Sequence, residues 1–92
     1  MRFHFDERKS RTLRTNPKRG IGFEEVQEVF SLPYYLDRRW DQAEQYRAIG
    51  WVEDQLFVVV FELRHDEEGE YYHLVTLWKA TSQEKELYEE YS

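Results

Sequence analysis

One run of eight residues limits how this chain can fold more than any other feature. The run is LFVVVFEL, Leu56 to Leu63, in which only Glu62 is polar. Because a strand points successive side chains to opposite faces, this run is apolar on both of its faces. We therefore expect it to form a central strand of a sheet, which Arg64 ends.

Two further strands are expected beside the central one. QYRAIGW, residues 45–51, alternates well enough for a strand. One face of that strand would carry Gln45, Arg47, Ile49 and Trp51. YYHLVTLW, residues 71–78, would return after a hairpin loop at DEEGE. A short edge strand is expected at the start of the chain, where Phe3 and Phe5 alternate with polar residues.

The first expected helix has an unusual composition. Asp6 is placed to cap it, and it would run to about Thr15, before Asn16-Pro17. Leu13 is its only sizeable apolar side chain. A broad apolar face therefore cannot hold this helix, so we expect that it lies loosely on the surface or that a partner covers it.

Two more helices complete the expected order. FEEVQEVF, residues 23–30, has apolar residues at helical spacing and ends before Pro33. Thr81 and Glu84 form a capping box that starts a last helix. Residues 34–45 are irregular and charged, and we expect a loop there. The predicted order is β-α-α-β-β-β-α, an α+β domain over residues 1–92 with a small antiparallel sheet and the helices to one side.

Length and composition restrict the class of protein. A chain of 92 residues corresponds to one domain, and its core has to rely on large side chains. The absence of cysteine means that no disulfide framework and no thiolate metal site are present. No apolar run approaches the ~18 residues of a membrane span, and the charged start MRFHFDERK lacks the apolar region of a secretory signal. We expect a cytoplasmic protein that does not bind membranes.

The charge is distributed unevenly along the chain. Residues 1–20 contain seven basic and two acidic residues, which is a charge of +5, whereas the other 72 residues carry −11. Such a basic segment can bind phosphate, dock an acidic partner or simply form a solvated helix face, and charge leaves all three interpretations open. No metal-ligand spacing, glycine-rich phosphate loop or Ser-His-Asp arrangement indicates a cofactor.

The order and spacing of several short motifs resemble the BrnT family of type II toxin-antitoxin toxins. A strand of the form Phe-x-x-Asp-x-x-Lys is matched by Phe3, Asp6 and Lys9. The helix start Gly-Ile-x-Phe-Glu-Glu is matched by residues 20–25, and an Ile-Gly strand followed by a valine-rich strand ending in arginine is matched by residues 49–64. The resemblance extends from Phe3 to Glu90.

The resemblance implies a RelE-like fold and a small ribonuclease that cleaves RNA without a metal. It also implies a cognate antitoxin, a DNA-binding protein encoded by a neighbouring gene, with which the chain would form a hetero-oligomer. The chain also departs from the family pattern, with Lys18-Arg19 in place of Lys-His and a short insertion around Asn16-Pro17; at two further positions, Gln45 and Trp78, family members have arginine. Since metal-free cleavage needs a base, an acid and cations for the phosphate, the departures at these last two positions remove charge from the expected site.

Candidate site residues follow from this chemistry. The proposed catalytic residues are Arg47, Arg64, Lys79 and His73, and the proposed RNA-binding residues are Arg14, Lys18, Arg19 and Trp78. Arginine suits a phosphate clamp because its planar fork stays charged and holds two oxygens. Arg47 shares a face with Gln45 and can supply the charge that Gln45 lacks.

Each of these candidates also has a structural interpretation. Trp78 fits core packing better than base stacking, and His73 fits a partly buried packing position better than an acid or base. Arg64 fits a solvated strand end as well as a phosphate clamp, and His4 fits an incidental position near the terminus. Two functions therefore remain: a working ribonuclease toxin, or a BrnT-like binding module that has lost cleavage. The acidic net charge of −6 favours the second.

Overall fold

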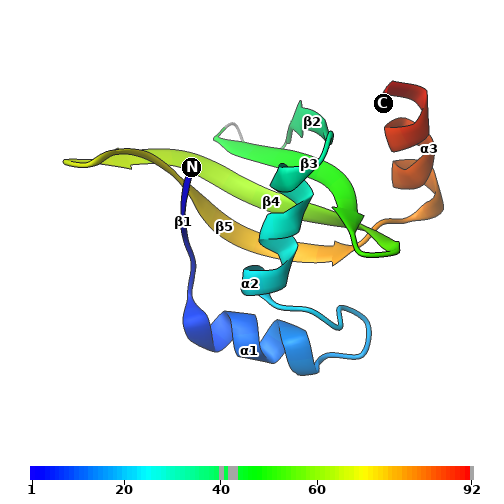
Figure 1. The fold of residues 1–92 in the computed structure, drawn as a ribbon, viewed down its shortest axis with the longest axis horizontal. Coiled ribbons are helices and arrows are strands. Elements are labelled where there is room, and N and C mark those ends of the chain that lie inside the picture. The colour runs from blue at the N-terminus through cyan, green and yellow to red at the C-terminus, as the bar shows by residue number, and fades with distance from the viewer. Residues whose placement is uncertain (40, 42–43, 92) are drawn as a thin grey trace.

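The computed structural model describes residues 1–39, 41 and 44–91. They form a mixed α+β arrangement, in which β1 precedes three helices, four consecutive strands follow, and one helix ends the order (Figure 1). In chain order the elements are β1 (Arg2–His4), α1 (Glu7–Thr15), α2 (Phe23–Val26), the 3₁₀ helix η1 (Gln27–Ser31), β2 (Tyr35–Arg38), β3 (Gln45–Val52), β4 (Gln55–Asp66), β5 (Gly69–Lys79) and α3 (Ser82–Tyr91). The α+β class predicted from the sequence is confirmed.

The five strands form one sheet in the order β1-β5-β4-β3-β2. The prediction of a central strand is confirmed, because β4 lies in the middle of this order. Adjacent strands are antiparallel except β1, which pairs with β5 in parallel. The sheet is therefore mixed, and the prediction of a purely antiparallel sheet was wrong. After β1 the chain forms α1, α2 and η1 and then re-enters the sheet at its opposite edge with β2.

Strand β2 was missed by the sequence analysis, which predicted a loop over residues 34–45. Its side chains alternate between half-buried and exposed, as in a strand with one covered face. Asp37 is a Cα partner of Arg47 on β3, so a charged residue that argues against a strand is here neutralised across the strand pair. That pairing cannot be seen from the local sequence.

Both faces of the sheet are covered, but by different helices. On one face, α1, α2 and η1 close the larger apolar cluster, in which Phe23, Val26 and Val29 are fully buried with residues of β3, β4 and β5. On the other face, α3 packs over Ile49, Leu56 and Val58 at one end of the sheet (Figure 1). The expectation that all helices lie on one side was wrong, since a strand apolar on both faces needs cover on both.

Helix α1 is held by polar contacts within the chain. Ser10 is fully buried, and its hydroxyl accepts a hydrogen bond of 2.8 Å from the Phe23 backbone amide. Arg14 pairs with Glu24 at 2.6 Å and with Glu25 at 3.0 Å. A Cβ on Gly22 would lie 2.5 Å from the Ser10 hydroxyl, so only glycine allows this close approach. The helix therefore neither lies loosely nor depends on a partner for its attachment to α2.

The predicted caps of the first and last helices are confirmed. The Asp6 carboxylate accepts from the Lys9 amide at 3.0 Å, at the start of α1. At α3, the Glu84 carboxylate accepts from the Thr81 amide at 2.8 Å while the Thr81 hydroxyl accepts from the Glu84 amide at 3.2 Å. This reciprocal bond fixes where β5 ends and α3 begins.

Candidate functional site

The sheet face that carries α3 has a second half that this helix does not cover. Helix α3 packs at one end, whereas the β4–β5 hairpin projects from the opposite end (Figure 1). We call the polar part of this face beyond α3 the open half. Its side chains are those of Arg2, His4, Gln45, Glu62, Arg64, Tyr71 and His73.

Strand register arranges these side chains in two rows. Gln45 is paired with Glu62, Glu62 with His73, and His73 with His4, so one row crosses β3, β4, β5 and β1. The next row runs from Arg64 through Tyr71 to Arg2. Because directly paired residues point to the same side of a sheet, both rows share one surface. The three consecutive strands β3, β4 and β5 thus meet there with β1 from the start of the chain.

Glu62 links the two rows. Its carboxylate accepts from Arg64 Nε at 3.0 Å and from Gln45 Nε2 at 3.2 Å. The hydrogen bond from Gln45, followed by the effect of Arg64, lowers the pKa of Glu62 below its ordinary value, although burial opposes this. Glu62 is therefore a carboxylate at neutral pH, and it holds the guanidinium of Arg64 against the strand.

His73 is half-buried in the middle of the first row. Burial lowers its pKa below the ordinary value of 6.5, and the charge of Arg64 lowers it further, while Glu62 raises it. Its imidazole is therefore neutral at pH 7 and can accept a proton. The row places it beside His4, whose ring stacks on Tyr71 with centroids 4.0 Å apart.

Arg47 lies in the half of the face that α3 covers. Its guanidinium is bound by two carboxylates. It binds Asp37 through two nitrogens, at 3.0 Å and 2.5 Å, and donates to Glu84 at 3.3 Å. The hydrogen bond to Asp37 is the main reason that the pKa of Arg47 is raised. Glu84 also accepts a hydrogen bond from Trp78 Nε1 at 3.0 Å. We call these four connected residues, Asp37, Arg47, Trp78 and Glu84, the Arg47 network.

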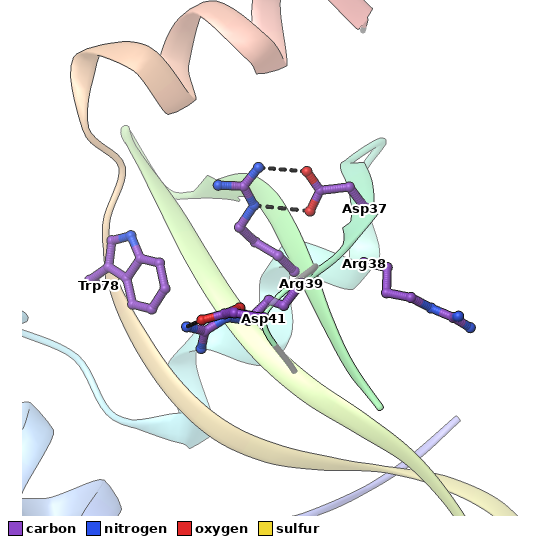
Figure 2. A pocket seen from close by; sticks show the side chains of 6 residues that line it. Asp37, Arg38, Arg39, Asp41 and Trp78 are labelled. Carbon is purple, nitrogen blue, oxygen red and sulfur yellow. Dashed lines mark hydrogen bonds and ion pairs between the residues drawn. The ribbon is translucent and has the colours of Figure 1, made fainter. Parts of the chain in front are cut away.

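Trp78 takes the packing role that the sequence analysis favoured for it. Its side chain packs against the smaller apolar cluster under α3, and Glu84 binds its indole nitrogen. A cavity of about 310 Å³ nevertheless lies beside it. The cavity is lined by Asp37, Arg38, Arg39, Asp41, Arg47 and Trp78 (Figure 2).

Lys79 and Arg19 lie together on the opposite side of the sheet. Both line a groove of about 300 Å³ with Gly20 and residues 52–55. The guanidinium of Arg19 donates to the Leu77 carbonyl at 2.9 Å. Since adjacent strand residues point to opposite faces, Lys79 cannot join Trp78 or Arg64 at one site.

The remaining predicted RNA-binding residues belong to the basic first segment. Arg14 is paired with Glu24 and Glu25, so much of its charge is already neutralised. Lys18 is exposed in the turn after α1, where its amide donates to the Asn16 side chain at 2.9 Å. Of the four proposed catalytic residues, the structure brings Arg64 and His73 together on the open half.

Glu62 and His4 of the open half were not proposed as site residues from the sequence. Glu62 was assigned to the apolar run, although the Glu-x-Arg spacing of Glu62 and Arg64 signals two charges on one strand face. His4 was set aside as incidental. Nothing in the local sequence shows that it lies beside His73, because this contact depends on the parallel pairing of β1 with β5.

Comparisons with known proteins add no family or relative. No known protein family matches the chain, and no curated protein matches it. Among the described residues, no helix is long and apolar enough to cross a membrane. The resemblance to BrnT toxins therefore stays a prediction.

Proposed function

We propose that this protein is a toxin-type RNA endonuclease that works without a metal ion and is silenced by a cognate antitoxin. The observation that carries the proposal is the meeting of Glu62, Arg64 and His73 on the open half. This arrangement joins a fixed cation to a neutral imidazole on adjacent strands. Both groups are reachable from solvent, because Arg64 is exposed and His73 is half-buried.

The chemistry of this arrangement fits cleavage by the RNA's own 2′-hydroxyl. His73 accepts the proton of that hydroxyl as the oxygen attacks the adjacent phosphorus. Arg64 stabilises the charge that develops on the phosphate oxygens. The bond from phosphorus to the 5′-oxygen breaks, and His4, in the same row, supplies the proton that this oxygen needs. The products are a 2′,3′-cyclic phosphate and a free 5′-hydroxyl, and no external reactant is consumed.

The two arginines differ in how readily they can reach a phosphate. The side chain of Arg64 is 48% exposed and pairs with one carboxylate, that of Glu62, whereas the side chain of Arg47 is 23% exposed and binds two carboxylates. A phosphate would have to displace Asp37 from a bidentate pair to reach Arg47. We therefore assign the clamp to Arg64 and a structural role to Arg47.

An exposed apolar strip on the other face supports a protein partner. It surrounds a depression of about 190 Å³ lined by Leu36, Tyr46, Phe61, Leu63 and Tyr72. Leu36 and Leu63, which both line this depression, are 49% and 44% exposed. An antitoxin that covers this strip would form a hetero-oligomer with the chain. We place this complex in the cytoplasm, where the RNA substrate is found.

One observation favours a second candidate, a binding module of the same kind without cleavage. Arg47 and Arg64 are each neutralised by carboxylates, and the chain carries −6 overall. RNA affinity depends strongly on the number of phosphates that a protein neutralises. Such a protein would bind the antitoxin and leave RNA intact.

The test is cleavage of a labelled RNA by the purified protein in the presence of EDTA. We expect cleavage that persists in EDTA and falls at least tenfold in both Arg64→Ala and His73→Ala. Arg11→Ala, an exposed arginine on α1, is the matched control and should cleave like the original protein. If the folded protein cleaves no RNA, the second candidate is supported, and binding to the product of the neighbouring gene tests it directly.

A further inference from the structure

The cavity beside Trp78 has no part in the cleavage chemistry. Trp78 forms one wall of it, as Figure 2 shows. The ring is held in place because both oxygens of Glu84 accept from Trp78 Nε1, at 3.0 Å and 3.2 Å. Glu84 is itself fixed by its capping bond to Thr81. The cavity thus has a rigid aromatic wall, and a nucleobase can stack on such a ring.

The polar groups around the cavity differ in how firmly they are paired. Arg47 and Asp37 form the closed bidentate pair of the Arg47 network. Arg39 and Asp41 are joined by one contact of 3.3 Å, and their side chains are 31% and 47% exposed. A surface ion pair of this kind contributes about 0 to 1 kcal/mol, so a ligand can replace it at little cost. Figure 2 shows Arg39 and Asp41 beside each other among the side chains that line the cavity.

A carboxylate beside a guanidinium selects one nucleobase. Guanine has two adjacent donors, N1–H and the exocyclic amine, which one carboxylate can accept together. It also has the O6 and N7 acceptors, to which arginine donates two bonds. Uracil has a single donor between two acceptors and cannot use the carboxylate in this way. The cavity, about 310 Å³ in volume, lies near the lower limit of ~300 Å³ for small-molecule sites.

Hydrogen bonds connect the cavity to the open half. Arg39 Nη1 donates to Gln45 Oε1 at 3.4 Å, and Gln45 Nε2 donates to Glu62 Oε2 at 3.2 Å. Gln45 therefore touches a group of the cavity and a group of the proposed cleavage site. A nucleotide next to the cleaved phosphate could place its base in the cavity while its phosphate faces Arg64.

We infer that this cavity is a guanine-binding subsite, in which the base stacks on Trp78 and is read by Asp41 and Arg39. Its place in the RNA substrate rests on the proposed function, but the binding of a mononucleotide does not. The subsite gives the proposed ribonuclease a preference for guanosine at one side of the cleaved bond.

Calorimetric titration with guanosine 3′-monophosphate and uridine 3′-monophosphate tests the subsite directly. We expect the guanosine nucleotide to bind at least tenfold more tightly. Asp41→Asn should remove most of this preference, because the amide cannot accept from both guanine donors. Asp54→Asn, an exposed acid on the other side of the sheet, is the matched control and should keep the preference.

Trp78→Phe is the second variant, and it should weaken binding of both nucleotides by a similar factor of several-fold. Its melting temperature is measured in parallel, because the indole also binds Glu84. Equal affinity for the two nucleotides overturns the inference, as does a guanosine preference that survives Asp41→Asn. Absence of binding at millimolar concentration overturns it as well.

The outcome separates the subsite from the proposed function. Guanosine binding without RNA cleavage would keep the subsite and remove the ribonuclease. RNA cleavage with no guanosine preference, either in mononucleotide binding or in the cleavage pattern, would keep the ribonuclease and remove the subsite.

Discussion

The two halves of the α3 face use similar residues for different purposes. In the covered half, Arg47 is bound by Asp37 and by Glu84, which is only 8% exposed. In the open half, Arg64 is exposed and pairs with Glu62 of its own strand. Both arginines point from adjacent strands to the same side of the sheet. The position of α3 therefore decides which arginine stabilises the fold and which can meet a ligand.

The largest expected difference between the halves comes from truncating their acids. Glu84→Ala leaves the partly buried Arg47, the Trp78 indole nitrogen and the Thr81 amide without their acceptor. We expect a loss of about 3 kcal/mol in the free energy of unfolding, measured by urea denaturation. Glu62→Ala is the counterpart in the open half and should cost less than about 1 kcal/mol. Equal losses of unfolding free energy in the two variants would contradict the view that the covered half stabilises the fold and the open half is free to bind a ligand.

The two arginines should behave in the same unequal way. Arg47→Ala leaves Asp37 and Glu84 without their cation and should cost about 2 kcal/mol in the free energy of unfolding. Arg64→Ala should leave stability unchanged, since its side chain is exposed. In the RNA cleavage assay the order reverses, with the greater loss per folded molecule in Arg64→Ala. A stable Arg47→Ala protein would show that the Arg47 network does not hold α3 in place.

A smaller effect is expected at the junction that fixes α3. Thr81→Ala removes the hydroxyl that accepts from the Glu84 amide, and loss of such a cap costs about 1 kcal/mol. Thr81→Ser keeps the hydroxyl and should be within experimental error of the original protein. Chemical denaturation of the three proteins under one set of conditions provides the comparison.

The smallest expected effect is the dependence of stability on the protonation of His73. Its pKa is lower in the folded protein than the ordinary value of 6.5, so the unfolded chain binds more protons between these two values. Stability should therefore fall as the pH decreases from about 6.5 through the folded pKa. His73→Gln should remove this part of the pH dependence. In the cleavage assay, activity should fall over the same acidic range, because a protonated His73 cannot act as the base.

Local patterns predicted those elements that local chemistry dictates. The caps at Asp6 and at Thr81 with Glu84 were correct because each involves residues three positions apart. Strand β4 was correct because its apolar run is continuous. Strand β2 was missed because Asp37 and Arg38 interrupt its apolar pattern, and its neutralising partner Arg47 lies ten residues away. The attachment of α1 was missed because a buried serine carries it.

The candidate site was predicted in part for the same reason. Arg64 and His73 were chosen as charged or titratable residues on expected strands, and the structure places them together. Lys79 was chosen from its position beside Trp78, but neighbouring strand residues face opposite ways, and it lies with Arg19 instead. Identifying Glu62 and His4 as site residues required the register of three strands. The sequence pattern of a single strand does not contain this information.

The sequence by itself determined the α+β class, the central strand, the helix caps and the list of groups capable of proton transfer and phosphate binding. These properties depend on composition and on residues close together in the chain. Only the tertiary structure decided which of those groups meet, because the contacts of Arg47 and His73 cross strands. It also decided that α3 covers half of one face, because this helix packs over the smaller apolar cluster and the bond between Glu84 and Thr81 fixes where it begins. The difference between a structural and an available arginine arises from that placement.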